Sequence, residues 1–381
     1  MTLVRSVHTI GSIEPWVGGP ARSVTSLARA LEGLGARTTL VTAHPPGDDL
    51  PFAVPSDLRA TAAGPGRRAR FRATFADAVG EGRPVVAHDH GIWLPTNHAV
   101  AAWTRRHGVP RVVSPRGMLD PWALRWHGAR KRVAWALYQR RDLRRADLLH
   151  ATSEAEADGF RARGLNTPVV VVPNGVDVSV DAAPLPGSDA GPRVLLFLSR
   201  VHPKKGLLHL AEAWARLEAP GWELWIAGPD ELDHEAEVRA ALERHARATT
   251  SPVRFLGPVT DAKRDELLAR CSAFVLPTLS ENFGQVVAEA LAAARPVLTT
   301  KAAPWRGLVD HGAGWWVETG TDALHAALTD LVAAPQERLA AMGVAGRAWI
   351  QRDLAWETVA HRMAAAYAWL GGGPQPDDVT A

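Results

Sequence analysis

PTLSENFGQVVAEAL, residues 277–291, places two carboxylates, Glu281 and Glu289, eight positions apart around the start of a predicted helix. The apolar run 272–276 before it is typical of a buried parallel strand, and 286–294 carries apolar residues at helical spacing. The start of such a helix presents unpaired backbone N–H groups and the positive end of the helix dipole, which suits an oxyanion such as a diphosphate. The stretch therefore predicts a strand, a binding loop and a helix.

The backbone amides at this junction are those of Phe283, Gly284 and Gln285, and Gly284 lets a phosphate approach the main chain closely. Since eight helical residues span at most about 12 Å, one elongated ligand can reach Glu281, the amides and Glu289 in turn. A nucleotide sugar has that layout, with hexose hydroxyls, a diphosphate and a ribose diol. The alternative is that Glu281 caps the helix and that Glu289 is an ordinary solvated residue.

Composition limits the possible classes of protein. With 381 residues, of which 46% are hydrophobic, the chain is long enough for two domains with substantial cores. A single cysteine, Cys271, excludes an internal disulfide and a cysteine zinc cluster, so the cytoplasm is the expected location. Residues 1–10 are typical of a first strand and not of a signal peptide, and no stretch is long enough to span a bilayer.

Strand-like and helix-like segments alternate along both halves of the chain, which predicts an α/β fold with parallel sheets covered by helices. The first half predicts strands at 4–9, 38–42, 85–88, 111–114, 148–151 and 169–172, and helices at 21–34, 96–107, 131–145 and 153–163. The second half predicts strands at 194–198, 223–227, 253–255, 273–276 and 296–299. Between the halves, the stretch 178–192 is rich in Pro, Gly, Ser and Asp, which is typical of a linker.

The second half opens with LFLSRVHPKKG, in which Arg200 and Lys205 stand five positions apart between a predicted strand and a helix. Two cations at that place can neutralise a diphosphate and stabilise the charge that develops as it leaves. Surface basicity is the alternative, because isolated basic residues usually lie in solvent. Lys204 is adjacent and is not required by this chemistry.

The two motifs together, R-x4-K-G at 200–206 and ENFGQVVAEA at 281–290, resemble the paired signatures of retaining glycosyltransferases of family 4. The resemblance implies two Rossmann-like domains of the GT-B type that face each other across a cleft. It also implies metal-independent transfer of a sugar, without a cofactor, from a nucleoside diphosphate sugar to a carbohydrate, lipid-linked or small hydroxyl acceptor. The stretch SPRGMLDPWAL, 114–124, is similar to bacterial enzymes of surface-polysaccharide assembly.

In this interpretation each motif binds a different part of the donor. Arg200 and Lys205 hold the diphosphate and assist its departure. Glu281 positions the sugar hydroxyls, and Glu289 binds the ribose diol. The remaining donor contacts come from the loop and the helix start, at Asn282, Phe283, Gly284 and Gln285.

A glycine pair follows the first predicted strand, in GSIEPWVGGPARSV, and precedes a predicted helix. Gly18 and Gly19 permit close approach of an anion to the backbone, and Pro20 suits a first helical turn. An ordinary turn is the alternative. The pair also resembles the N-terminal glycine loop of family 4, whose amides face the donor diphosphate, so both glycines are predicted donor contacts.

VVAHDHGIWLP, 85–95, ends a predicted strand with His88 and His90 on one face, at the kind of strand end where ligands bind. A metal pair is one alternative, but spacing places no third ligand, so we expect no metal site. We expect the two histidines and Trp93 to line a polar acceptor pocket, with packing as the alternative for Trp93. The next strand leads to Arg116, where many family members carry a histidine, and Arg116 is expected to bind an acceptor phosphate or carboxylate.

The sequence also bears on other classes of protein. The chain has no G-x-G-x-x-G followed by an acid and no G-x4-G-K-[ST], so neither a dehydrogenase nor a nucleoside triphosphatase is indicated. A nucleotide-sugar epimerase or hydrolase on the same fold stays open, because the histidines of the first half can serve as acids or bases. A non-catalytic sugar-binding protein also stays open, although binding alone gives no chemical reason to keep both motifs.

The stretch 125–145, RWHGARKRVAWALYQRRDLRR, concentrates basic residues around aromatic and aliphatic ones. A solvated surface helix with a buried apolar side is one interpretation. The other is peripheral contact with an anionic membrane, at the inner face of the cell membrane, or with a diphosphate-linked lipid acceptor. No nucleic-acid recognition module accompanies the charge, so nucleic acid is not an expected partner.

The predicted domain boundaries follow from the linker and the resemblance. Residues 1–180 form the acceptor domain and 193–353 the donor domain, joined by 181–192. The resemblance implies that the helix at about 354–370 crosses back onto the first domain. The tail 371–381, GGGPQPDDVTA, is expected to be disordered.

Overall fold

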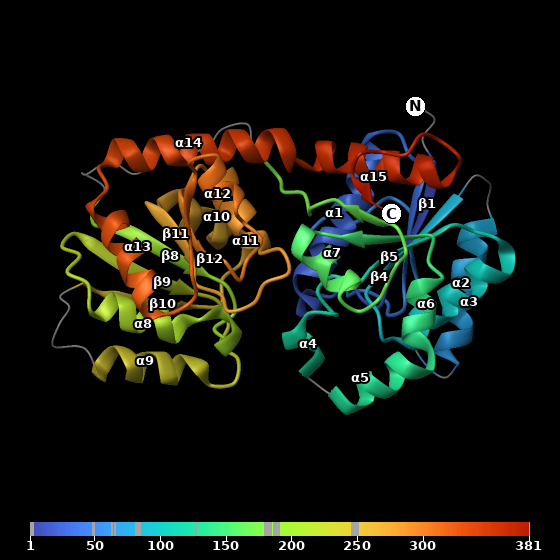
Figure 1. The fold of residues 1–381 in the computed structure, drawn as a ribbon, viewed down its shortest axis with the longest axis horizontal. Coiled ribbons are helices and arrows are strands. Elements are labelled where there is room, and N and C mark those ends of the chain that lie inside the picture. Colours follow the sequence, from blue (N-terminus) through green and yellow to red (C-terminus); the bar gives the residue numbers. More distant parts are fainter. Residues whose placement is uncertain are drawn as a thin grey trace. The chain divides into compact units, whose positions relative to one another are not determined.

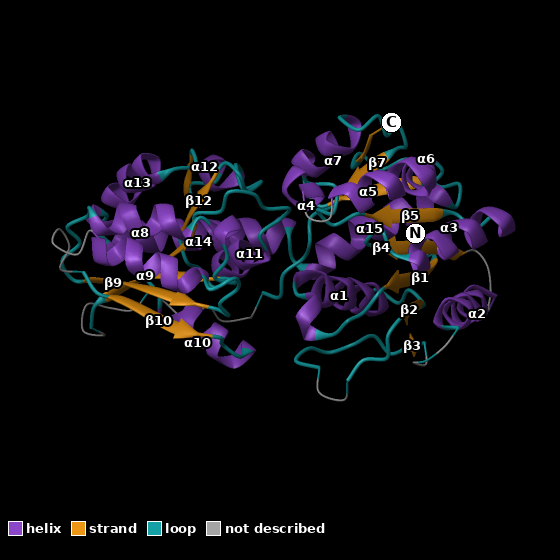
Figure 2. Ribbon diagram, turned by 90° about the horizontal axis from the view of Figure 1, so that it is seen from below, coloured by secondary structure: helices purple, strands orange, loops and turns teal. Residues whose placement is uncertain are grey.

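The computed structural model describes residues 4–47, 50–61, 64, 66–80, 85–125, 128–178, 185, 191–244 and 251–380. The chain forms two compact units, each built on its own sheet (Figure 1, Figure 2). Unit 1 comprises Met1–Gly175 with Trp356–Ala381, and unit 2 comprises Val176–Ala355. Most of the predicted linker, 181–192, lies outside the described residues. The predicted α/β class with two Rossmann-like sheets is confirmed.

Unit 1 is built on an eight-stranded sheet with the order β14-β7-β6-β5-β4-β1-β2-β3. All neighbouring strands are parallel except β14 and β7. From β1 the chain adds β2 and β3 on one side and β4 to β7 on the other, so the strand order reverses between β1 and β4, where such sheets bind ligands. The strands are β1 (Arg5–Ile10), β2 (Thr38–Thr42), β3 (Leu58–Ala60), β4 (Val85–His90), β5 (Arg111–Ser114), β6 (Leu148–Ala151), β7 (Val169–Val171) and β14 (Val379–Thr380).

Helices cover both faces of this sheet. Alternate residues of a strand point to opposite faces, so apolar residues throughout the strand centres bury both faces. On one face Val86, Val112 and Leu148 pack against α1 (Gly19–Gly33) and α15 (Trp356–Leu370). The other face is covered by α2 (Arg67–Gly80), α3 (Pro95–His107) and α7 (Glu154–Arg161). The remaining α-helices of unit 1 among the described residues are α4 (Pro121–Arg125), α5 (Gly128–Ala134) and α6 (Arg140–Arg144). A π-helical segment, Trp135–Gln139, joins α5 to α6, and a 3-10 turn, Pro15–Val17, precedes α1.

Unit 2 has a six-stranded, fully parallel sheet with the order β10-β9-β8-β11-β12-β13 and a core of its own. Its strands are β8 (Arg193–Leu198), β9 (Trp222–Ala227), β10 (Val253–Gly257), β11 (Ala273–Leu276), β12 (Val297–Thr300) and β13 (Gly314–Val317). Its helices are α8 (Leu207–Ala215), α9 (His234–Arg244), α10 (Asp261–Arg270), α11 (Gln285–Ala292), α12 (Gly307–Asp310), α13 (Thr321–Ala333) and α14 (Gln336–Asp353).

The C-terminal tail differs from the prediction of disorder. Val379 and Thr380 form β14, which pairs antiparallel with β7 at the edge of the unit 1 sheet. The Arg362 guanidinium donates to both carboxylate oxygens of Asp378, at 2.7 and 2.8 Å, and Val379 is only 5% exposed. The tail is therefore ordered by an ion pair and a small apolar anchor, neither of which its Gly- and Pro-rich composition reveals.

Candidate functional site

Two loops of unit 2 are joined beside the predicted donor residues. One loop follows β8 and the other follows β11, the neighbouring strand in the sheet. The Leu279 N–H donates to the Lys204 carbonyl at 2.8 Å. Gly206 has φ +70°, and a Cβ at this position would lie 2.0 Å from the Pro277 carbonyl oxygen. Only glycine fits there, so R-x4-K-G includes its glycine because the two loops touch.

Lys205 and Glu281 form an ion pair at the junction of these loops. The Lys205 Nζ lies 2.6 Å from a Glu281 carboxylate oxygen, and the two side chains are 11% and 15% exposed. The Glu281 backbone is fixed as well, because its N–H donates to the Ala302 carbonyl at 3.0 Å. Two residues that stand 76 positions apart in the chain thus present one cation and one anion side by side.

The loop after β11 ends in a left-handed turn that begins α11. Gly284 has φ +83°, and a Cβ there would lie 3.2 Å from both the Glu281 Cγ and the Trp305 Nε1. The Trp305 indole donates to the Phe283 carbonyl at 2.5 Å and packs on the Phe283 ring. Among the described residues, the amides of Phe283 and Gly284 donate to no protein acceptor. They are therefore available to an oxyanion, next to Asn282 and the first helical residue, Gln285.

Glu289 lies one turn further along α11 and is close to a cation. Its carboxylate is 3.9 Å from the Arg264 guanidinium, and the two side chains are 15% and 18% exposed. Burial lowers the pKa of Arg264, but Glu289 and the neighbouring Asp265 raise it overall. The Glu289 carboxylate therefore lies beside a cation, and its oxygens can accept hydrogen bonds from a diol.

The Arg200 side chain forms an ion pair with Glu231. Its Nη1 lies 2.9 Å from both carboxylate oxygens of Glu231, and the two side chains are 58% and 35% exposed. Glu231 follows β9, and the next two residues, Leu232 and Asp233, both have positive φ. The sequence reading missed Glu231, although an acidic residue just after a predicted strand was a usable signal.

The glycine pair of unit 1 lies at the start of α1. Gly18 has φ +77°, which only glycine adopts without strain, and both glycines are exposed. A Cβ at Gly19 would meet no atom within 4 Å. No described residue outside the local chain therefore crowds the two glycines.

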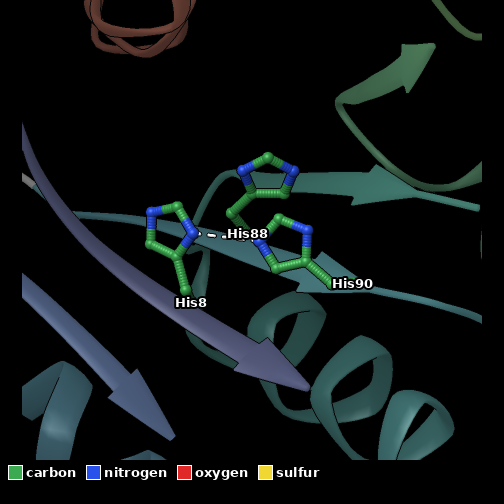
Figure 3. A group of neighbouring side chains, drawn as sticks. All are labelled: His8, His88 and His90. Atoms are coloured by element: carbon green, nitrogen blue, oxygen red, sulfur yellow. Dashed lines mark hydrogen bonds between the residues drawn. The ribbon is translucent and has the colours of Figure 1, made fainter. Parts of the chain in front are cut away.

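Polar residues from five elements meet inside unit 1 and form what we call the histidine chain: His90, His8, Tyr367, His88, Ser114 and His150. They come from β1, β4, β5, β6 and α15, and each is at most 2% exposed. Figure 3 shows the imidazoles of His8, His88 and His90 packed beside one another. Of the six residues of the histidine chain, the sequence pattern had indicated only His88 and His90.

Each link of the histidine chain is a hydrogen bond. His90 Nε2 lies 2.9 Å from His8 Nδ1 (Figure 3). Tyr367 Oη lies 3.4 Å from His8 Nε2 and 2.6 Å from His88 Nδ1. Ser114 Oγ lies 2.6 Å from His88 Nε2. The last helix of the chain therefore completes a polar contact between the first strand and β4.

The far end of the histidine chain fixes the direction of every bond in it. His150 Nε2 lies 2.7 Å from the Val172 carbonyl, which can only accept, so this nitrogen donates and Nδ1 accepts from Ser114 at 2.6 Å. Ser114 Oγ then accepts from His88 Nε2, and His88 Nδ1 accepts from the Tyr367 hydroxyl. The Tyr367 oxygen accepts from His8 Nε2, and His8 Nδ1 accepts from His90, which donates through Nε2. His90 Nδ1 therefore accepts from Arg116, whose Nε and Nη2 both lie 3.2 Å away.

All the imidazoles of this arrangement are neutral. Burial, with Arg116 nearby, lowers the pKa of His8 and of His150 to about 3. Burial and the neighbouring rings bring the pKa values of His88 and His90 well below the ordinary range. None of these rings can serve as a protonated acid near neutral pH.

The structure changes the argument about a metal at this place. The spacing argument found no third ligand, but His8, from the neighbouring strand, puts a ring nitrogen within 4.8 Å of those of His88 and His90. Every ring nitrogen of the three is, however, engaged in a hydrogen bond of fixed direction, and the Arg116 cation lies at one end. The geometry favours neutral hydrogen-bonded imidazoles over a metal-binding set.

The predicted acceptor residues are thus placed at different depths. His88 and His90 are buried, and Arg116 donates to His90 Nδ1. Arg116 and Trp93 are partly exposed and lie in the loops that follow β5 and β4. Trp93 packs beside Trp135, with ring centroids 6.3 Å apart.

Comparison with known proteins agrees with the two units. Residues 18–175 match the glycosyl transferase 4-like domain, and residues 192–334 match glycosyl transferases group 1. The glycogen synthase of Mycobacterium tuberculosis strain H37Rv is 30% identical over 312 residues, which cover 77% of this chain and 72% of that protein. The chain belongs to glycosyltransferase family 4.

Other family 4 relatives differ in what they act on. The GDP-mannose-dependent alpha-(1-6)-phosphatidylinositol monomannoside mannosyltransferase of Mycolicibacterium smegmatis is 30% identical over 326 residues, 75% of this chain and 84% of that protein. Anabaena HepE, solved in complex with UDP-glucose, superposes with a TM-score of 0.73 at 20% identity, over 96% of this chain and 100% of that one. This likeness shows the GT-B fold.

Within the described residues, no helix combines the length and the apolar character needed to cross a membrane.

Proposed function

We propose that this glycosyltransferase moves a sugar from a nucleoside diphosphate sugar to a hydroxyl acceptor, with retention of the anomeric configuration and without a metal. The observation that carries the proposal is the Lys205–Glu281 ion pair beside the two available amides at the start of α11. A cation and two amides suit a diphosphate, and a carboxylate suits sugar hydroxyls. HepE, the structural neighbour of the same fold, was solved with UDP-glucose, which supports a donor of this class.

In the proposed reaction the acceptor oxygen bonds to the anomeric carbon as the bond from that carbon to the diphosphate oxygen breaks. The acceptor hydroxyl proton passes to a phosphate oxygen of the leaving group on the same face. Lys205 stabilises the negative charge that grows on the diphosphate, and Arg200 does so once it leaves Glu231. Glu281 holds the sugar hydroxyls and Glu289 the ribose diol, so no carboxylate acts as a nucleophile.

The test begins with a thermal-shift screen of nucleotide sugars, followed by product analysis with the donor that binds. Mass spectrometry must show a glycosylated acceptor, and NMR must show the anomeric configuration of the donor in the product. Incubation with donor alone is the control, because fast conversion without an acceptor indicates the epimerase or hydrolase alternative. Turnover that survives treatment with EDTA supports the metal-independent course, and its loss contradicts it.

For the acceptor, we propose that α5 and α6 bring this enzyme to an anionic membrane surface that carries a lipid-linked acceptor. Val133 and Leu137 are 59% and 70% exposed. Around them stand exposed arginines that have no carboxylate partner among the described residues, namely Arg130, Arg132, Arg140, Arg141 and Arg145. Near an anionic leaflet each such residue contributes about 1 kcal/mol of binding. The mannosyltransferase relative, whose name specifies a phosphatidylinositol mannoside, supports an acceptor of this kind.

Cosedimentation with vesicles tests this surface. The protein is expected to bind phosphatidylglycerol vesicles at low salt and not phosphatidylcholine vesicles, and high salt should release it. R140Q/R141Q/R144Q/R145Q should bind weakly. A control matched in charge, R216Q/R239Q/R338Q/R352Q in unit 2, should bind like the wild type because these four arginines are ion-paired. Equal binding by both variants overturns the membrane proposal.

A further inference from the structure

Arg116 is a cation with only neutral partners. Its Nη1 donates to Ser23 Oγ at 2.9 Å and to Asn174 Oδ1 at 3.2 Å, and its Nε and Nη2 share His90 Nδ1. Among the described residues, no carboxylate oxygen lies within ion-pair distance of it. A charge that is only partly exposed to water and has no counter-ion is unfavourable, so its retention calls for a reason.

The carboxylate whose charge acts on Arg116, that of Glu156, is already engaged by other donors. Glu156 accepts from the Gly117 N–H at 2.7 Å and from the backbone and hydroxyl of Thr152 at 2.8 and 3.0 Å. It influences Arg116 only through space, and burial lowers the pKa of the guanidinium to about 10. The group is therefore still cationic at neutral pH and is not neutralised by the fold.

The backbone at this place is strained. Arg116 has φ +52° and Trp93 has φ +80°, and these residues lie in the loops that follow the neighbouring strands β5 and β4. Left-handed backbone at non-glycine residues gathers at ligand sites. The Trp93 indole Nε1 is also buried without a hydrogen-bond partner among the described residues. Two adjacent loops thus hold an unneutralised cation and an unused donor.

We propose that Arg116 binds an oxyanion, either an anionic group of the acceptor or the donor diphosphate. Nη2 keeps one hydrogen that no described residue accepts, so the guanidinium can give an oxyanion one charge-assisted hydrogen bond together with its positive charge. Ser23, on α1, brings the positive end of that helix to the same place. The histidine chain supports the guanidinium through His90 without cancelling its charge, because its rings stay neutral. The inference rests on the proposed function only for the source of the oxyanion.

Calorimetric titration of the full chain with inorganic phosphate tests the inference. We expect two sites, one lost in R116Q and the other lost in R200Q/K205Q, each with affinity reduced at least tenfold. R29Q replaces an exposed arginine of α1 and is the matched control, which should bind like the wild type. Phosphate binding by R116Q that equals that of R29Q overturns the proposal.

Two additions keep the test decisive. If R116Q does not fold, ¹⁵N NMR of the wild type replaces it: phosphate must shift the Arg116 Nε–H signal, assigned with R116K, and an unchanged signal overturns the proposal. UDP then separates the sources. Weaker UDP binding by R116Q assigns the donor diphosphate, whereas unchanged UDP binding with lost phosphate binding assigns the acceptor. Phosphate binding is measured without turnover, so failure of the proposed transfer leaves this result standing.

Discussion

The two candidate sites of this enzyme hold charge in opposite ways. Unit 2 pairs full charges on partly exposed loops, as in Lys205–Glu281 and Arg200–Glu231. Unit 1 instead buries neutral imidazoles in a chain of fixed direction and leaves Arg116 alone as the cation. The exposed Arg200–Glu231 pair contributes little stability, so a ligand can replace Glu231 as the partner of Arg200 at small cost. The Lys205–Glu281 pair is largely buried, so a ligand that separates it has to supply a new partner for each charge. A buried chain of neutral groups cannot exchange partners or take up protons without loss of stability, which makes the unit 1 site rigid.

Acid should produce the largest difference in stability between the two units, because it should destabilise unit 1 more than unit 2. The folded pKa values of His8 and His150, about 3, lie below the ordinary 6.5, so below pH 6.5 the unfolded chain binds more protons and stability falls. Each histidine contributes roughly 1.4 kcal/mol per pH unit, or about 5 kcal/mol for both between pH 6.5 and 4.5. Burial raises the pKa of Asp89, so protonation of this carboxyl in the folded state partly offsets the loss of stability in acid. The offset is the smaller effect, because it comes from one group whereas four histidines have lowered pKa values.

Hydrogen exchange at pH 7.0, 6.0 and 5.0 measures the effect for each unit. Amides of β1 and β4 should lose protection before those of β8 and β11. Equal loss in both sheets would show that the imidazoles do not stay neutral in the folded state.

Removal of the unit 2 cations should reduce turnover by about 10²-fold or more, because their interaction with the diphosphate grows as it leaves. This holds for Lys205→Ala and for Arg200→Ala. Arg200→Ala should leave the melting temperature nearly unchanged, because its ion pair with Glu231 is exposed. Steady-state kinetics with a saturating donor reads the effect, and Lys204→Ala is the neighbouring control. Wild-type turnover in a folded Lys205→Ala enzyme contradicts the mechanism.

Loss of one hydroxyl from the histidine chain should destabilise unit 1. Tyr367→Phe leaves His88 Nδ1 without its donor, and a buried acceptor without a partner costs about 1–3 kcal/mol of unfolding free energy. Urea denaturation measures it. Tyr138→Phe, at a partly buried tyrosine, is the control and should cost less. Equal losses in the two variants would mean that the chain carries no special stability.

Glu289→Ala should have the smallest effect, a donor affinity about tenfold weaker with turnover at saturation nearly unchanged, as for uniform binding of the ribose. Calorimetry with UDP measures it beside Glu218→Ala, an exposed control. Unchanged affinity would remove Glu289 from the donor site.

The same contrast explains what the sequence could predict. The unit 2 site is built from two short motifs after neighbouring strands, so Lys205 and Glu281 could be assigned to one site before their contact was known. The bounds of β2, β5, β6 and β11 also followed from local patterns. The histidine chain joins residues from 8 to 367, and local periodicity carries no information on which strands are neighbours. A signal was present, since a polar residue inside an apolar strand, such as His8 or His150, needs a buried partner.

The position of Tyr367 also has a consequence for the order of synthesis. A ribosome makes β1, β4, β5 and β6 early, but it adds Tyr367 only after all of unit 2 has been translated. Until then the His88 ring in the nascent chain lacks one partner, and the sheet face that α15 covers stays open. Unit 1 therefore cannot reach its final state until the last helix has been synthesised, although its first strand is the first to be made.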